Sequence, residues 1–140
     1  MRIVFKMLVA LHVSLYRLTR GKFGGKIGSM PVLLLTTTGG KTGRTRTTAL
    51  SYFEHDGGYV IIGSNGGFVT HPAWFHNLTR NPRAMVEIND RRSEVEAATA
   101  GPEKRPQLWA RLMELAPGYQ AYANKTRREI PIVTLRPVKT

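Results

Sequence analysis

Short β-type segments separated by glycine-rich turns constrain the fold of this chain most strongly. Residues 32–38 (VLLLTTT) form a continuous run of apolar and β-branched residues, which is typical of a buried strand. A second strand is expected at 45–53, and the sequence EHDGG at 54–58 predicts a hairpin turn into a third strand at 59–64. Further strands are expected at 84–89, 93–100 and 130–138.

The connections between these segments indicate the fold class. A short helix is expected at 73–78, where Trp74 and Leu78 fall on one side, and a longer helix at 102–117. Residues 118–128 form a loop or a short helix. The strands are joined mostly as hairpins, and the strand–helix alternation that builds a parallel sheet is lacking. The sequence therefore predicts a mainly β protein with flanking helices, built as a small barrel of about six mostly antiparallel strands.

The first 25 residues are expected to form an N-terminal amphipathic helix, and residues 26–140 the barrel domain. The uncharged run 7–16 is too short to span a bilayer, which needs roughly 20 residues. Two interpretations stay open. Either the apolar stripe packs on the domain or on a partner subunit, or residues 1–20 lie on an acidic membrane face. The stripe consists of Val4, Leu8, Leu11, Leu15 and Leu18.

Composition narrows the possible partners. The chain has 21 Lys and Arg against 9 Asp and Glu, and its net charge of +12 favours an anionic partner. Nucleic acid, an acidic membrane surface and a polyanionic small molecule all fit this charge. Cysteine is absent, which excludes disulfides and cysteine nucleophiles and suits the cytoplasm. The 4 histidines lack metal-ligand spacing, so no metal site is expected.

A basic, glycine-bracketed loop between the first two expected strands is the strongest candidate site. Its glycines let main-chain N–H groups approach an anion, while Lys41 and Arg46 add charge and Thr42 adds a hydroxyl donor. The loop lacks the spacing of a P-loop and no helix is expected after it. Judged on composition alone, the loop fits a basic hairpin turn that faces water better than an anion site, because Lys- and Arg-rich turns are common in a protein this basic.

Three other stretches carry candidate site residues. The corner Ser64–Gly67 follows a buried strand end and is expected to expose main-chain amides to a planar ring or a phosphate. On the helix at 73–78, adjacent Trp74 and Phe75 point in different directions, so one can pack in the core while the other lines a pocket. Tyr119 and Tyr122 share a helix face and can close over a flat substrate. Each stretch also fits an ordinary turn or core packing.

No nucleophile–base pair or paired carboxylates are visible, which for an enzyme indicates a reactive centre supplied by a cofactor. In combination, the four stretches LLLTTTGGKTGRTR, GSNGG, HPAWFHNLTRNP and PGYQAY resemble the deazaflavin-dependent nitroreductases. These are split-β-barrel oxidoreductases that use coenzyme F-420, an 8-hydroxy-5-deazaflavin. The likeness covers nearly all of the chain after Pro31, and it implies a split β-barrel for this protein.

The resemblance assigns roles to the candidate residues. In the family, the K-T-G-x-x-R loop holds the phosphate of the coenzyme and the start of its oligoglutamate tail. Tyr119 or Ser64 is implied to supply a proton, and Tyr119 and Tyr122 to face the substrate. The implied cofactor-binding residues are Gly40, Lys41, Thr42, Arg46, Thr47, Thr48, Ala49, Leu50, Ser51, Ile62, Gly63, Ser64, Asn65, Ala73, Trp74, Phe75, His76, Asn77 and Tyr119.

The implied reaction is hydride transfer from C5 of the reduced coenzyme to an electrophilic acceptor such as a quinone, an enone or a nitroaromatic. The chain departs from the family pattern at three positions. Asn65 stands where a lysine is frequent, His71 where an asparagine precedes the proline, and Ala116 where a further tyrosine lines the pocket. The expected location is the cytoplasm, with peripheral contact on the inner face of the cell membrane.

Three alternatives remain at this point. A small basic barrel can bind nucleic acid, although the aromatic residues gather near glycine corners instead of alternating along exposed strands. A related barrel can use flavin mononucleotide in place of the deazaflavin. A deazaflavin carrier can hold the coenzyme without catalysis. The sequence leaves the oligomeric state open.

Overall fold

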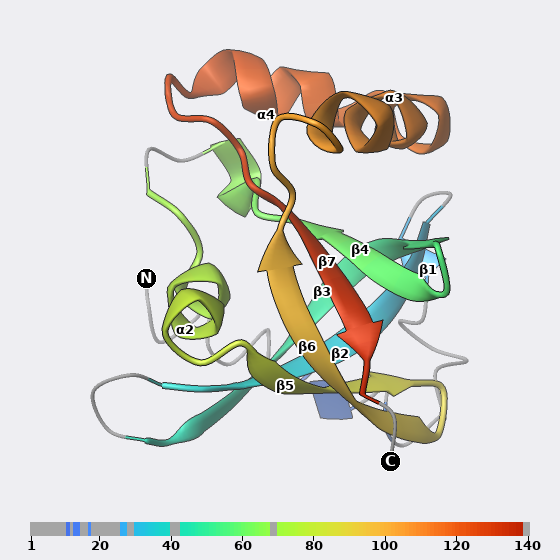
Figure 1. Ribbon diagram of the computed structural model, residues 1–140, viewed down its shortest axis with the longest axis vertical. Coiled ribbons are helices and arrows are strands. Elements are labelled where there is room, and N and C mark those ends of the chain that lie inside the picture. The colour runs from blue at the N-terminus through green and yellow to red at the C-terminus, as the bar shows by residue number, and fades with distance from the viewer. Residues whose placement is uncertain are drawn as a thin grey trace.

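The computed structural model describes residues 11, 13, 14, 17, 26–27, 30–39, 43–67 and 70–138. Within these residues, six antiparallel strands close into a barrel in the order β2-β3-β4-β7-β6-β5, with β2 also pairing with β5 (Figure 1). A short β1 pairs with β2 outside this ring. The strands are β1 (Lys26–Ile27), β2 (Met30–Thr38), β3 (Thr45–His55), β4 (Gly58–Ile62), β5 (Arg83–Ile88), β6 (Arg91–Thr99) and β7 (Ile132–Pro137).

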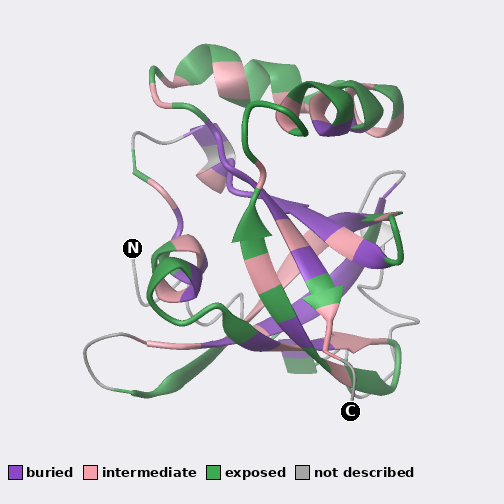
Figure 2. Cartoon of the chain, viewed as in Figure 1, coloured by how far each residue is buried: buried purple, intermediate pink, exposed green. Residues whose placement is uncertain are grey.

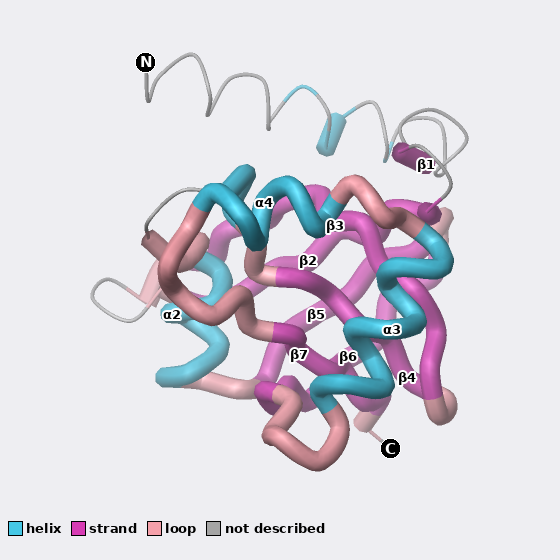
Figure 3. Tube along the Cα trace, turned by 90° about the horizontal axis from the view of Figure 1, so that it is seen from above, coloured by secondary structure: helices cyan, strands magenta, loops and turns pink. Residues whose placement is uncertain are grey.

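Three α-helices and a 3₁₀ turn with described bounds flank the barrel. The helix pair α3 and α4 lies across one end of the barrel, and α2 lies at its side (Figures 1 and 3). A 3₁₀ turn, η1, follows β4. The bounds are η1 (Asn65–Gly67), α2 (Ala73–Arg80), α3 (Arg105–Leu115) and α4 (Tyr119–Lys125), and residues 11, 13, 14 and 17 are helical as well.

Burial on both faces of the barrel wall explains the apolar run in β2. Leu33 and Leu35 point into the barrel interior, where Trp74 and Leu78 of α2 join them. Successive strand residues face opposite sides, and the intervening Leu34 packs outside. Each buried leucine contributes about 1.5–3 kcal/mol relative to an exposed one. Figure 2 shows that buried residues gather along these strands, while the outer faces of the helices and the hairpin ends are exposed.

Two further clusters cover the outer face of the barrel. Leu108 and Leu112 of α3 pack on Phe53 and Ile132. Val13, which is 8% exposed, packs on the β2–β3 surface near Leu34. Val13 is not one of the residues of the expected apolar stripe, and Leu11, which belongs to that stripe, is 56% exposed. The other stripe residues lie outside the described residues, as do most of residues 1–25.

The expected barrel of about six mostly antiparallel strands with flanking helices is confirmed. Two details differ from the expectation. The two-residue strand β1 has no sequence pattern of its own. Helix α3 begins at Arg105 and not at 102, because residues 102–104 form a turn in which the N–H groups of Lys104 and Arg105 both donate to the Gly101 carbonyl.

Candidate active site

The central part of β3 forms one wall of the candidate site. Residues 47–51 are all half-buried, which is unusual for an interior strand whose residues alternate between core and surface. Thr47, Ala49 and Ser51 face outward, whereas Thr48 and Leu50 pair with inward-pointing residues of β2. On this outer side, Ala49 borders the cluster of Val13, Val32 and Leu34.

The hairpin between β2 and β3 supplies positive charge at one end of this wall. The Gly39 N–H donates to the Arg44 carbonyl at 2.7 Å, and the Gly43 N–H donates to the Gly39 carbonyl at 3.0 Å. Gly43 has a φ of 69°, which favours glycine. Arg44 and Arg46 are exposed, and β3 begins directly at Thr45, so no helix follows the loop as a P-loop would require. The predicted phosphate ligands Gly40, Lys41 and Thr42 lie outside the described residues.

The corner after β4 is more enclosed than the sequence indicated. Ser64 is 9% exposed, and Gly63 is also buried. The Gly63 N–H donates to the Pro131 carbonyl at 2.9 Å, and the Gly67 N–H donates to the Ser64 carbonyl at 2.9 Å. The expectation of open main-chain amides is therefore wrong for Gly67, because a hydrogen bond within the corner already uses its N–H.

Helix α2 contributes residues of two kinds. Trp74 is 8% exposed and belongs to the barrel interior, while Phe75 is half-buried and borders that cluster. Trp74 thus packs in the core as expected, and the prediction that Phe75 lines a pocket stays a prediction. The Asn77 amide donates to the Thr37 hydroxyl at 3.0 Å and thereby fixes α2 to β2. Ala73 and His76 are exposed.

Two tyrosines of α4 meet β3 at the other end of the wall. The rings of Tyr119 and Tyr122 lie edge to face with centroids 5.6 Å apart, so they share one helix face as predicted. The Tyr119 side chain is hydrogen-bonded to that of Ser51. Burial raises the pKa of Tyr119; the bond to Ser51 opposes this shift and the neighbouring Tyr122 adds to it. Tyr119 consequently holds its proton at neutral pH.

Arg128 is a site residue that the sequence pattern did not reveal. Its guanidinium donates to the Gly63 carbonyl at 3.0 Å and to the Ser64 carbonyl at 2.8 Å. It also lies 2.9 Å from Nδ1 of His71. Nothing in the local sequence distinguishes Arg128 from its exposed neighbour Arg127, because the difference depends on the tertiary contacts that the C-terminal segment makes.

These contacts connect the predicted site residues in space. Tyr119 joins α4 to β3 through Ser51, and η1 lies against α4, since a Cβ on Gly67 would lie 3.0 Å from the Lys125 Cβ. Arg128 joins the Ser64 corner to the segment that leads into α2. Three of the proposed ligands do not present their side chains to this surface: Thr48 and Leu50 face the barrel interior, and Trp74 fills it.

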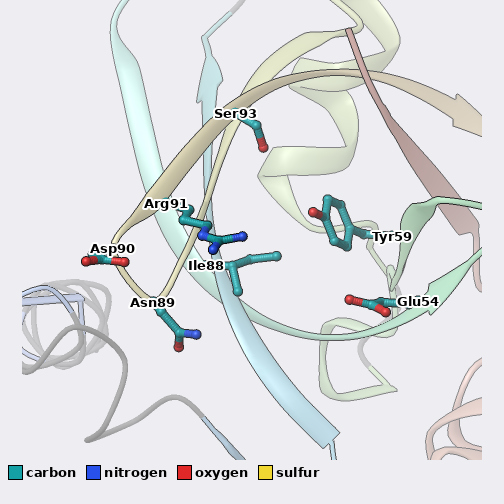
Figure 4. A pocket seen from close by; sticks show the side chains of 7 residues that line it. All are labelled: Glu54, Tyr59, Ile88, Asn89, Asp90, Arg91 and Ser93. Atoms are coloured by element: carbon teal, nitrogen blue, oxygen red, sulfur yellow. The ribbon is translucent and has the colours of Figure 1, made fainter. Parts of the chain in front are cut away.

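A separate pocket of about 370 Å³ lies between the β3–β4 hairpin and the β5–β6 turn (Figure 4). None of the predicted site residues lines it. Its two carboxylates, Glu54 and Asp90, disfavour a polyanionic ligand. The lining residues are Glu54, Tyr59, Ile88, Asn89, Asp90, Arg91 and Ser93.

Within the described residues, His, Asp and Glu side chains form no group of three or more that could hold a metal ion. In the same part of the chain, no helix combines the length and the apolar character that a membrane crossing requires.

Comparisons with known proteins agree with this geometry. The family model for F420H(2)-dependent quinone reductase matches residues 8–137. The F420H(2)-dependent quinone reductase of Mycobacterium tuberculosis (strain H37Rv) is 39% identical over 134 residues, covering 91% of this chain and 89% of the relative. A second M. tuberculosis protein, named as a putative member, is 30% identical over 108 residues, covering 77% of this chain and 91% of its own.

Solved structures support the same assignment. A structure described as an F420-H2 dependent reductase has a TM-score of 0.69 and 34% identity, covering 76% of this chain and 94% of its own. Another, described as a domain-swapped dimer, has a TM-score of 0.71 and 31% identity, covering 91% and 96%. The chain therefore belongs to the F420H(2)-dependent quinone reductase family, and it is a split-β-barrel reductase that depends on coenzyme F-420.

Proposed function

We propose that this protein transfers a hydride from reduced coenzyme F-420 to a quinone, and that it also accepts enones and nitroaromatics. The observation that carries this proposal is the hydroxyl pair of Ser51 and Tyr119 beside a half-buried strand. The phenol of this pair lies beside the half-buried residues 47–51, where we propose that the coenzyme ring binds. The curated relatives named as quinone reductases support a quinone as the acceptor.

The residues present fit the coenzyme. Coenzyme F-420 combines a flat ring with a phosphate and an oligoglutamate tail, so its site needs cations at one end and a partly apolar wall at the other. Exposed Arg44 and Arg46 supply cations at the hairpin end of β3, and the half-buried residues 47–51 supply the wall. We assign Lys41, Thr42 and Arg46 to the phosphate, and the Ser64 corner and residues 73–77 to the sides of the ring.

When bound, the reduced deazaflavin supplies a hydride from C5 in a two-electron step. A quinone that receives this hydride needs one proton to become a hydroquinone. Tyr119 holds a proton at neutral pH and lies within hydrogen-bonding reach of Ser51, which orients the phenol. Ser64 is the second candidate donor, but its burial makes it a better support for the corner than a proton source. The partial burial of β3 reduces the access of water to the reacting groups.

We further propose that residues 26–140 form the cofactor-binding unit and that residues 1–25 form an appended helix. Arg17 pairs with Glu87 at 3.2 Å and Val13 is buried, which supports docking of this segment on the barrel. Leu11 is 56% exposed and supports contact of residues 1–20 with a membrane that carries a lipid quinone. We propose that the enzyme lies in the cytoplasm, on the inner face of that membrane.

Turnover tests this function directly. The purified protein is mixed anaerobically with the reduced coenzyme and menadione, and the absorbance of the oxidised coenzyme is followed. We expect the absorbance to return only when protein and acceptor are both present, and reduced flavin mononucleotide to fail as the donor. Tight coenzyme binding without turnover for any quinone, enone or nitroaromatic would instead identify a carrier. Retarded migration of nucleic acid at physiological salt would favour the nucleic-acid alternative.

A further inference from the structure

We propose that Arg128 is a positioning residue that assembles the coenzyme site by holding the Ser64 corner and the approach to α2 in one arrangement. The inference rests on the proposed location of the coenzyme. Arg128 is outside every motif that resembles the deazaflavin enzymes. It lies three residues beyond the end of α4, in the segment that leads to β7.

One guanidinium binds two consecutive main-chain carbonyls. Nη1 of Arg128 donates to the Gly63 carbonyl at 3.0 Å and Nη2 donates to the Ser64 carbonyl at 2.8 Å. This planar fork restrains both the position and the orientation of the peptide between these residues. The Gly63 N–H is bound at the same time to the Pro131 carbonyl at 2.9 Å. The corner is therefore fixed from two sides by the segment that precedes β7.

The same guanidinium also contacts the segment that leads into α2. Its Nη1 lies 2.9 Å from Nδ1 of His71, the residue before Pro72 and the start of α2. Between the corner and this segment, the Asn65 amide donates to the Thr70 carbonyl at 3.0 Å. Arg128 thus links Ser64 to His71, and these two residues border two of the proposed walls of the coenzyme site.

The contact requires a neutral His71, because Nδ1 must accept a hydrogen bond from a cation. Burial, then Arg128, then His76 lower the pKa of His71, so the neutral form is favoured around neutral pH. The groups that face the imidazole are Arg128 from the C-terminal segment and His76 and the Phe75 ring from α2. None of the three stabilises a positive charge as a carboxylate does. Protonation of His71 would therefore replace a hydrogen bond by repulsion between two cations.

A lysine cannot replace this arginine. An ammonium group is a compact charge on a flexible stem and cannot span two carbonyls and an imidazole in one plane. We expect Arg128→Lys to preserve the net charge and the fold but to lose the link between Ser64 and His71. Arg127→Lys is the matched control, because Arg127 is the adjacent residue, carries the same charge and is exposed.

The first measurement is calorimetric titration of the ligand-free proteins with oxidised coenzyme F-420. We expect Arg128→Lys to weaken binding by about 10-fold to 100-fold, as loss of charge-assisted hydrogen bonds does. We expect Arg127→Lys to bind like the wild type. If the wild type fails to bind, the proposed function is wrong. If the wild type and Arg128→Lys bind equally, the function stands and the positioning role is overturned.

The second measurement needs no Arg128 variant and therefore does not depend on its folding. The pKa of His71 is determined by NMR in the ligand-free protein, and coenzyme affinity is measured from about pH 7.5 to about pH 5.5 in wild type and His71→Asn. An asparagine oxygen accepts the hydrogen bond but does not titrate, and ionisation of the coenzyme itself is common to both proteins. We expect the wild type to lose more affinity at low pH than His71→Asn. Equal losses, or a His71 pKa at or above its ordinary value, would contradict the proposal.

Discussion

A methyl group added at Gly63 probes how closely the coenzyme corner is packed. The Cβ of an alanine at this position would lie 2.6 Å from the Pro131 Cγ and 3.2 Å from its Cδ. The pyrrolidine ring cannot rotate away, and the Pro131 carbonyl already holds the Gly63 N–H. Gly63→Ala must therefore push the corner and the segment before β7 apart.

The size of this displacement follows from the contact. Ordinary van der Waals contact begins at 3.4 Å, so the backbone has to yield by about 0.8 Å. Overpacking of this kind costs about 1–3 kcal/mol. At this chain length, each kcal/mol lowers the melting temperature by about 3–4 °C. Because Arg128 donates to the Gly63 carbonyl, the shift also moves the predicted ring contacts, and a misplacement of about 1 Å can reduce a rate by about 100-fold.

Thermal unfolding and coenzyme titration measure the two effects separately. Gly101→Ala is the control, because a Cβ at that position meets nothing within 4 Å. We expect Gly63→Ala to melt several degrees lower and to bind the coenzyme more weakly, while Gly101→Ala behaves like the wild type. A Gly63→Ala protein with unchanged melting temperature and affinity would refute the close packing of the corner against Pro131.

Three other outcomes are expected. Leu112→Ala removes a fully buried side chain under α3 and should lower the free energy of unfolding by about 2–5 kcal/mol in urea, with little change in coenzyme affinity. Tyr119→Phe should lower the turnover of menadione by about 100-fold while Ser51→Ala, which keeps the phenol, should lower it less; equal losses would contradict the proton-donor role. The pKa of Tyr119 is raised in the folded protein, so its contribution to stability is present below the ordinary tyrosine pKa and is lost as the pH rises through the folded value. In alkaline thermal melts, the wild type should therefore lose more stability than Tyr119→Phe.

The strands could be predicted because their buried positions are occupied by apolar and β-branched residues. In β2, the run of apolar residues reflects burial of Leu33 and Leu35 inside the barrel and of Val32 and Leu34 outside it. The turn at Asp56 and Gly57 could be predicted as well, because Asp-Gly is a residue pair that favours a hairpin turn. Both residues adopt the positive φ that such a turn requires, with values of 50° and 75°. Local propensity and long-range packing agree in these segments.

The contacts that organise the site could not be predicted in the same way. Arg128 lies 64 residues from Ser64 along the chain, and its role depends on where β4 ends beside β7. The hydrogen bond of the Gly67 N–H to the Ser64 carbonyl is local and was missed, whereas that of the Gly63 N–H joins the Pro131 carbonyl of a segment that no local pattern links to it. Conversely, alternation along β3 could have separated the outward Ser51 from the inward Leu50, although the resemblance assigned both to the ring.

The central claim is that the coenzyme lies against β3, between the Ser64 corner, α2 and α4. Backbone amide NMR of the labelled protein, titrated with oxidised coenzyme F-420, tests the claim most directly. We expect the largest shift changes within residues 44–51, 62–65, 73–77 and 119–122. Changes gathered instead around the pocket of Glu54, Tyr59 and residues 88–93 would contradict it.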